Sequence, residues 1–100
     1  MIDSLTNEQL CELVYQDRIS SHSKGLGDQA FEILYTRNLP TTIGQIARIL
    51  TQVSQSASDA EFIANGVMMR VYQAIRKGRF DATRSYTPWV KQITRNSIVD

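Results

Sequence analysis

The segment from Arg79 to Arg95 holds the residues whose types and spacing best suit the binding of a ligand. Large aromatic side chains alternate there with basic ones: Phe80, Tyr86 and Trp89 among Arg79, Arg84, Lys91 and Arg95. Bases displaced from a duplex stack on flat apolar rings, each stack contributing about 1–3 kcal/mol, while cations hold the phosphates. A single large aromatic residue more often closes a core. In combination with the surrounding cations, these rings favour nucleic-acid binding.

The charge of the chain is distributed unevenly, although the net charge is only +1. From Arg70 to Arg95 there are seven basic residues and one acidic residue, Asp81, which gives a local charge of +6. A field of this sign attracts polyphosphate chains. The alternative is an ordinary solvated basic face.

The residues that serve enzymes and metal sites do not form a set. His22 lies in a serine-rich loop, and Cys11 is the single cysteine. Lys24, Gly25 and Gly27 lack the spacing of a phosphate-binding loop. We therefore expect no enzyme activity, no metal and no cofactor. No apolar run is long enough to span a membrane, and with a lone cysteine this favours a cytoplasmic protein in a reducing compartment.

Helical periodicity predicts the elements that must position these residues. A capping box from Thr6 to Gln9 starts a helix over residues 7–18, and Asp28 is a candidate N-cap for a second one. Apolar residues recur at helical spacing on both sides of Pro40. This pattern indicates either a kinked helix or a new helix with Pro40 in its first turn.

The second half of the chain predicts two further helices. The third follows a capping box from Ser58 to Glu61 and ends at Gly78, with a buried stripe of Ile63, Val67, Val71, Ala74 and Ile75. Thr87 and Pro88 suit the N-cap and first position of the fourth. The fold class is all-α, a compact bundle of three to four helices. Asp100 lies inside the helical pattern, so we expect the natural chain to continue.

The third helix carries apolar residues outside its main stripe, namely Phe62, Met69 and Met68. They form either an exposed patch for a partner helix or part of a wide buried face. Periodicity alone leaves both readings open.

Four pieces of the chain, in order, resemble region 2 of sigma-70 family RNA polymerase sigma factors of the extracytoplasmic-function type. They are residues 27–35 (GDQAFEILY), residues 59–61 with 67–75 (DAE, VMMRVYQAI), Phe80-Asp81, and residues 89–93 (WVKQI) followed by Arg95-Asn96 and Asp100. The resemblance spans residues 25–100, and residues 1–24 form an N-terminal helix and loop before it.

The resemblance implies a non-enzymatic domain that melts promoter DNA. It implies that the loop and fourth helix read the single-stranded non-template strand of the −10 element, with the DNA-binding residues Arg79, Phe80, Arg84, Tyr86, Trp89, Lys91, Gln92, Arg95 and Asn96. It also implies that the third helix docks on the clamp helices of the largest subunit of core RNA polymerase, through Phe62, Asn65, Gly66, Met69 and Tyr72. An anti-sigma factor is a further partner of this family.

The third helix departs from the family pattern. The family usually has an acidic residue at the position of Phe62 and Gln-Glu at the positions of Asn65 and Gly66. The change removes two charges and introduces a glycine that weakens the helix by about 1 kcal/mol. The alternative function is a sigma-like interaction module that binds polymerase or a regulator without melting DNA.

Overall fold

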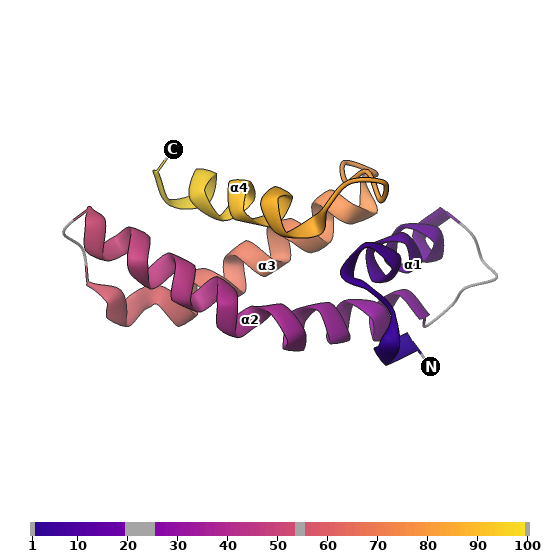
Figure 1. Cartoon of the computed structure of the whole chain (residues 1–100), viewed down its shortest axis with the longest axis horizontal. Coiled ribbons are helices and arrows are strands. Elements are labelled where there is room, and N and C mark those ends of the chain that lie inside the picture. The colour runs from indigo at the N-terminus through magenta and orange to yellow at the C-terminus, as the bar shows by residue number, and fades with distance from the viewer. Residues whose placement is uncertain (1, 20–25, 54–55, 100) are drawn as a thin grey trace.

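The computed structural model describes residues 2–19, 26–53 and 56–99, and within these ranges every regular element is helical (Figure 1). The elements are η1 (Ile2–Ser4), α1 (Asn7–Ile19), α2 (Leu26–Gln52), η3 (Ala57–Asp59), α3 (Ala60–Arg76) and α4 (Tyr86–Val99), where η denotes a 3-10 turn. The predicted all-α bundle is confirmed. The predicted loop with His22, Lys24 and Gly25, and the chain end at Asp100, lie outside the described residues.

Helix α2 is the longest helix, and the other three helices pack against it. Its 27 residues span about 40 Å at 1.5 Å per residue, which is most of the 47 Å length of the protein. Pro40 lies inside this helix, so the chain continues through the proline and no new helix starts there. The ribbon bends part-way along (Figure 1). Proline leaves the carbonyl of Thr36 without its helical partner, and Thr36 is exposed to solvent.

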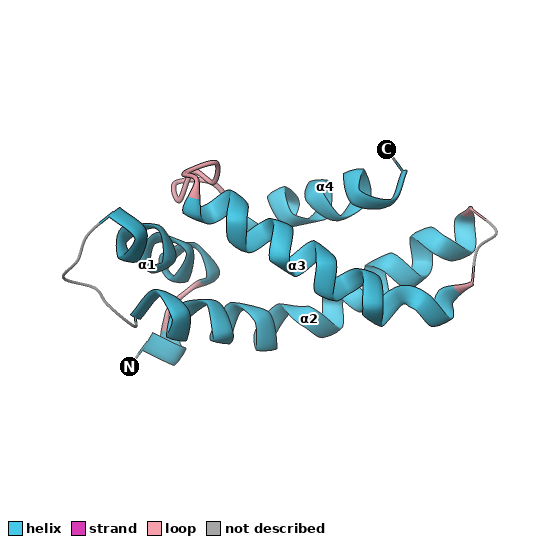
Figure 2. Ribbon diagram, turned by 180° about the vertical axis from the view of Figure 1, so that it is seen from behind, coloured by secondary structure: helices cyan, strands magenta, loops and turns pink. Residues whose placement is uncertain are grey.

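One hydrophobic core joins all four helices, and α1, α3 and α4 all pack against α2, with α1 near its start and α4 further along it (Figure 2). Its fully buried members include Leu10 from α1, Leu34 and Ile46 from α2, Val71 from α3 and Tyr86 from α4. The N-terminal helix therefore contributes to the same core as residues 25–100. In the described part of the chain, no helix combines the length and apolarity needed to cross a bilayer.

Two predicted helix starts have different outcomes. The capping box of α1 is confirmed, because the Thr6 N–H donates to Gln9 Oε1 at 2.8 Å and the Gln9 N–H donates to Thr6 Oγ1 at 3.1 Å. The box predicted at Ser58 is wrong. Asp59 occupies the N-cap of α3 without a side-chain capping bond, and the Ser58 hydroxyl pairs with that of Ser56 at 2.7 Å. The tight turn η3 leads directly into the helix instead.

Glycines lie at two further helix ends, the start of α2 and the end of α3. Helix α2 begins at Leu26, so Asp28 lies in its first turn and is not its N-cap. A Cβ at Gly27 would approach the Cβ of Asp17 to 2.5 Å, so glycine allows α1 and α2 to pack at this end. Gly78 ends α3 at φ 74°, as predicted. The Gly78 N–H donates to the Ile75 carbonyl and the Arg79 N–H to that of Ala74, which is a Schellman motif.

Candidate nucleic-acid interface

The start of α4 is fixed by a carboxylate from the other end of the chain. Glu8 Oε2 accepts the Tyr86 N–H at 2.7 Å in a partly buried position. The helix therefore begins at Tyr86 and not at Thr87, which corrects the predicted N-cap, and Pro88 falls within the first turn. A carboxylate at this end of a helix satisfies a free N–H and complements the helix dipole.

Three aromatic rings meet where the loop after α3 joins α4. The ring centroids of Phe80 and Trp89 are 4.7 Å apart, and Tyr86 lies 6.0 Å from Phe80 and 6.3 Å from Trp89. Phe80 and Trp89 are half-buried and keep part of their rings in solvent. These two rings are therefore both anchored to the core and accessible to a ligand.

Tyr86 differs from the other two rings, because only 1% of it is exposed. Its burial corrects the expectation that it stacks a base, since the ring packs in the core beneath Phe80 and Trp89. Burial raises the pKa of the Tyr86 phenol, and the neighbouring Cys11 and Glu8 raise it further. The buried Tyr86 hydroxyl has no hydrogen-bond partner among the described residues.

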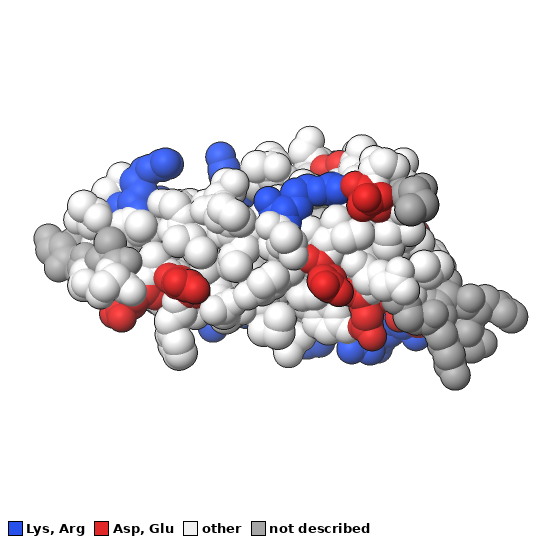
Figure 3. Space-filling model, turned by 90° about the horizontal axis from the view of Figure 1, so that it is seen from below, with Lys and Arg blue, Asp and Glu red and all other residues white. Residues whose placement is uncertain are grey.

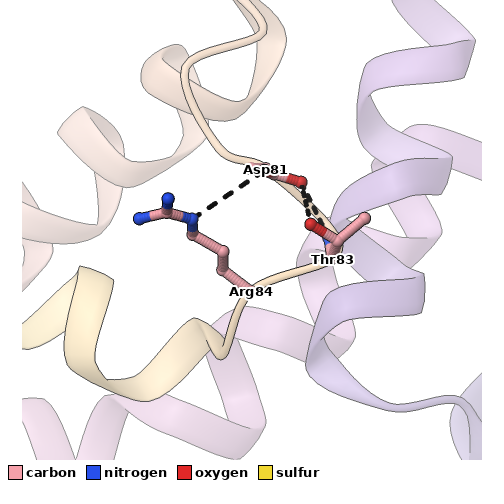
Figure 4. A network of polar contacts seen from close by, with 3 residues as sticks. All are labelled: Asp81, Thr83 and Arg84. Atoms are coloured by element: carbon pink, nitrogen blue, oxygen red, sulfur yellow. Dashed lines mark hydrogen bonds and ion pairs between the residues drawn. The ribbon is translucent and has the colours of Figure 1, made fainter.

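Asp81 orders the loop between α3 and α4 (Figure 4). Its Oδ1 accepts the Thr83 N–H at 2.9 Å and the Thr83 hydroxyl at 2.6 Å, while Oδ2 lies 3.9 Å from Arg84 Nε. Its carbonyl accepts the Arg84 N–H at 2.9 Å, which closes the turn. The hydrogen bonds from Thr83, with the Arg84 charge, lower the pKa of the Asp81 carboxyl. The loop thus holds the Arg84 side chain, 84% exposed, beside the aromatic rings.

A pocket of about 510 Å³ opens between this loop and α4, lined by Arg79, Phe80, Asp81, Arg84, Ser85, Pro88 and Trp89. This volume is within the usual range for sites that take small organic groups, roughly 300–1,000 Å³. Half-buried aromatic rings beside exposed cations can hold a flat ring that is attached to a phosphate. The structure therefore brings Arg79, Phe80, Arg84 and Trp89 together, as the sequence predicted.

The outer face of α4 carries the other predicted DNA-binding residues. Lys91, Gln92, Arg95 and Asn96 are all exposed on it. The Gln92 side-chain amide donates to Asn96 Oδ1 at 2.9 Å, so these two residues form one polar unit. This face begins beside the pocket and extends along the helix away from it.

The predicted polymerase-binding residues lie on a second surface, the exposed face of α3. Phe62 is 82% exposed and Met69 47% exposed, with Asn65 and Gly66 exposed between them. Met68 is fully buried and belongs to the core. Of the apolar residues outside the main stripe, Phe62 and Met69 thus form an exposed patch, whereas Met68 widens the buried face.

Tyr72 and Asn65 join this surface to neighbouring elements. The centroids of the Tyr72 and Phe31 rings are 4.5 Å apart, and Phe31 belongs to α2. The Arg76 guanidinium lies over the Tyr72 ring, 5.4 Å from its centroid. Asn65 Oδ1 accepts a hydrogen bond from the Tyr35 hydroxyl. Both residues are therefore held by other side chains, whereas Phe62 and Met69 project freely.

No family model, curated protein or solved structure matches this chain. In the ranges that the structure describes, no three His, Cys, Asp or Glu side chains come close enough to hold a metal ion.

Three residues that shape the site, Asp81, Thr83 and Glu8, were not predicted as site residues from the sequence. The spacing of Asp81 and Thr83 is typical of a side-chain turn and was a detectable signal. Glu8 carries no local signal, since 78 residues separate it from Tyr86.

Proposed function

We propose that this chain is the promoter-melting domain of an alternative sigma factor of the extracytoplasmic-function type. The proposal combines the sequence resemblance with an all-helical fold and with the clustering of the predicted DNA-binding residues at one site. It places the protein in the cytoplasm, at the nucleoid, with core RNA polymerase and −10 promoter DNA as its partners.

The single observation that carries the proposal is the pocket beside Phe80 and Trp89. Its half-buried rings supply a stacking surface, and Arg79 and Arg84 at its rim supply charge for the flanking phosphates. A base that leaves a duplex loses a few kcal/mol of stacking and pairing, and contacts of this kind offset that cost. The protein then acts by binding energy, and no catalytic step is required.

The faces of the pocket and of α4 have different roles in this proposal. The pocket holds an unstacked base of the non-template strand. Gln92 and Asn96, on the exposed face of α4, meet base edges of the adjoining duplex, and Lys91 and Arg95 meet its phosphates. Amide side chains can distinguish bases, whereas contacts to phosphates set position and salt dependence.

The test compares single-stranded oligonucleotides of −10 type with scrambled ones, by fluorescence anisotropy. We expect Trp89→Ala to weaken binding of the −10 type by about 5- to 150-fold, the equivalent of one lost stacking contact. Trp89→Phe, which keeps a stacking ring, should retain most of the affinity. Equal binding of both oligonucleotides, unchanged by Trp89→Ala, would refute the DNA-melting function.

We further propose that the exposed face of α3 docks on the clamp helices of the largest polymerase subunit. The support is its position in the sequence and the exposure of Phe62 and Met69. A pull-down with core polymerase should compare the native chain with Phe62→Glu and Gly66→Glu, which restore the acidic character usual in the family. Tighter binding of the variants would show a weakened docking surface, and weaker binding would show one rebuilt around apolar contacts.

A second candidate function is favoured by the same exposed Phe62. An apolar side chain that projects by itself into solvent suits a protein partner better than DNA. In this alternative the chain binds polymerase or a regulator such as an anti-sigma factor without melting DNA. Binding of polymerase together with the absence of preference for −10 oligonucleotides would select it.

A further inference from the structure

Acidic residues are absent from a continuous part of the molecule. The sequence has none between residues 33 and 58, which include most of α2, and none between residues 82 and 99, which include all of α4. In the view from below, acidic side chains lie toward the left end and over the right half of the face, with mostly uncharged surface between them, and basic side chains lie at the upper left, at the lower margin and beside the acidic groups on the right (Figure 3). A polyanion that lies along α4 and the later part of α2 therefore meets no acidic side chain from either helix.

These two helices pack side by side. Thr42, Ile46 and Ile49 of α2 are buried, as are Val90 and Thr94 of α4. At the edge of this contact the Gln45 side-chain amide donates to the Lys91 carbonyl at 3.3 Å. We name the line of contact between α2 and α4, marked by this bond, the α2–α4 seam.

Arg48 lies on the solvent side of the seam. It follows Gln45 by three residues, so it lies about one turn further along the same side of α2, and it is exposed. Arg95 follows Lys91 by four residues and is also one turn further along, exposed, on α4. Both helices run in the same direction in Figure 1, so Arg48 and Arg95 lie at the same end of the seam.

In the part of the chain that the structure describes, these cations have no acidic partner. Among residues 2–19, 26–53 and 56–99, the only ion pair joins Arg84 to Asp81, so Arg48, Lys91 and Arg95 form none. An exposed, unpaired arginine can contact a phosphate without first breaking an ion pair.

We propose that Arg48, with Lys91 and Arg95, forms a track along the α2–α4 seam for the phosphates of duplex DNA. This inference rests on the proposed function, because it places the duplex next to the strand that enters the pocket. Arg95 is six residues from Trp89, about 9 Å along α4. A strand held at the pocket therefore reaches the seam within a few nucleotides, and α2 becomes part of the DNA-binding surface.

The experiment measures the affinity of the 100-residue chain for two DNA probes over a range of salt concentrations. One probe is a −10-type single strand, and the other carries the same single strand joined to a duplex arm. We expect Arg48→Gln to weaken binding of the duplex-containing probe by about threefold to tenfold at low salt, and to lower its salt slope by about 0.9. The single strand should bind within about twofold of the native value.

Two variants serve as controls. Arg48→Lys keeps the positive charge, so it should preserve the salt slope of the native chain. If the role of Arg48 were purely structural, the salt slope would not depend on whether the charge is kept. Arg18→Gln makes the same charge change on an exposed residue of α1, at the opposite end of the molecule, and should leave both probes unaffected.

Two results would refute the proposed phosphate track. One is an Arg48→Gln variant that binds the duplex-containing probe with native affinity and native salt slope. The other is an Arg48→Gln variant that loses the same affinity for both probes. Failure of the proposed function has a different signature, in which Trp89→Ala leaves the single strand unaffected. The two inferences can therefore be rejected separately.

Discussion

The two surfaces assigned to partners are built in opposite ways. The pocket and α4 are held by several fixed contacts, one of them from the other end of the chain: Glu8 fixes the helix start, Asp81 orders the loop, and the buried Tyr86 ring supports the aromatic pair. The exposed face of α3 consists of side chains from a single helix, with Phe62 and Met69 free in solvent. A site that must hold a flipped base needs fixed geometry, whereas a docking face needs mainly exposed apolar area.

The largest expected effect is on the free energy of unfolding, and it differs between two adjacent residues of α3, one buried and one exposed. Met68→Ala should lower the free energy of unfolding by about 2–5 kcal/mol, because Met68 is fully buried and its truncation leaves a cavity. Met69→Ala, at 47% exposure, should change it by no more than about 0.5 kcal/mol. Urea denaturation followed by circular dichroism measures both, and similar losses would contradict the exposed docking face.

Glu8 tests whether the α4 site depends on distant contacts. Glu8→Ala should cost about 1.5–3 kcal/mol of unfolding free energy, since it removes a charged partner from a partly buried N–H. The Tyr86 amide should also lose protection from hydrogen exchange, and the emission of the single tryptophan, Trp89, should shift. Glu12→Ala is the matched control, an exposed glutamate one turn further along α1. Unchanged exchange at Tyr86 would show that the cap is dispensable.

Removing the Tyr86 hydroxyl should stabilise the protein, whereas removing the Glu8 carboxylate in the same region should destabilise it. Its buried hydroxyl has no described partner, and an unpaired buried hydroxyl costs about 1–3 kcal/mol. Tyr86→Phe keeps the ring, so we expect it to raise the free energy of unfolding by about 1 kcal/mol. A clear loss of stability in urea denaturation would mean that the hydroxyl is hydrogen-bonded in solution.

Gly66 provides a smaller gain on the α3 face. A Cβ at this position would have no heavy atom within 4 Å outside the local helix, so alanine fits freely. Gly66→Ala should stabilise the protein by about 0.5–1 kcal/mol through helix propensity. Thermal unfolding measures the change, with Ala74→Gly as the reverse control within the same helix. A destabilising Gly66→Ala would indicate that the face is less open than described.

The smallest effect concerns the pH dependence of the loop. Contacts from Thr83 and Arg84 lower the pKa of Asp81 in the folded state below its unfolded value. The stabilisation is therefore fully present above the unfolded pKa, about 3.9, and is lost as pH falls through the lower folded pKa. A titration of the Thr83 amide resonance should show a midpoint below 3.9, the approximate value for a free aspartate. Asp81→Asn should abolish that titration, and a midpoint at or above 3.9 would contradict the ordered loop.

Much of the fold was predictable because it depends on local patterns. The periodicity of apolar residues predicted four helices, and Thr6, Gln9 and Gly78 marked two of their ends through contacts within a few residues. The segment from Arg79 to Trp89 was likewise predictable as a cluster of cations and rings, because these residues are close in the chain.

Other features depend on contacts that sequence spacing does not encode. The Glu8 carboxylate moves the start of α4 to Tyr86, and packing decides that Met68 is buried while Met69 is exposed. The placement of Gln45 against the Lys91 carbonyl of α4 also follows from how the helices pack. Apolar periodicity and residue types are enough to predict the helices and the charge of each segment. The tertiary structure decided which faces are buried, because burial depends on neighbours that are distant in the chain.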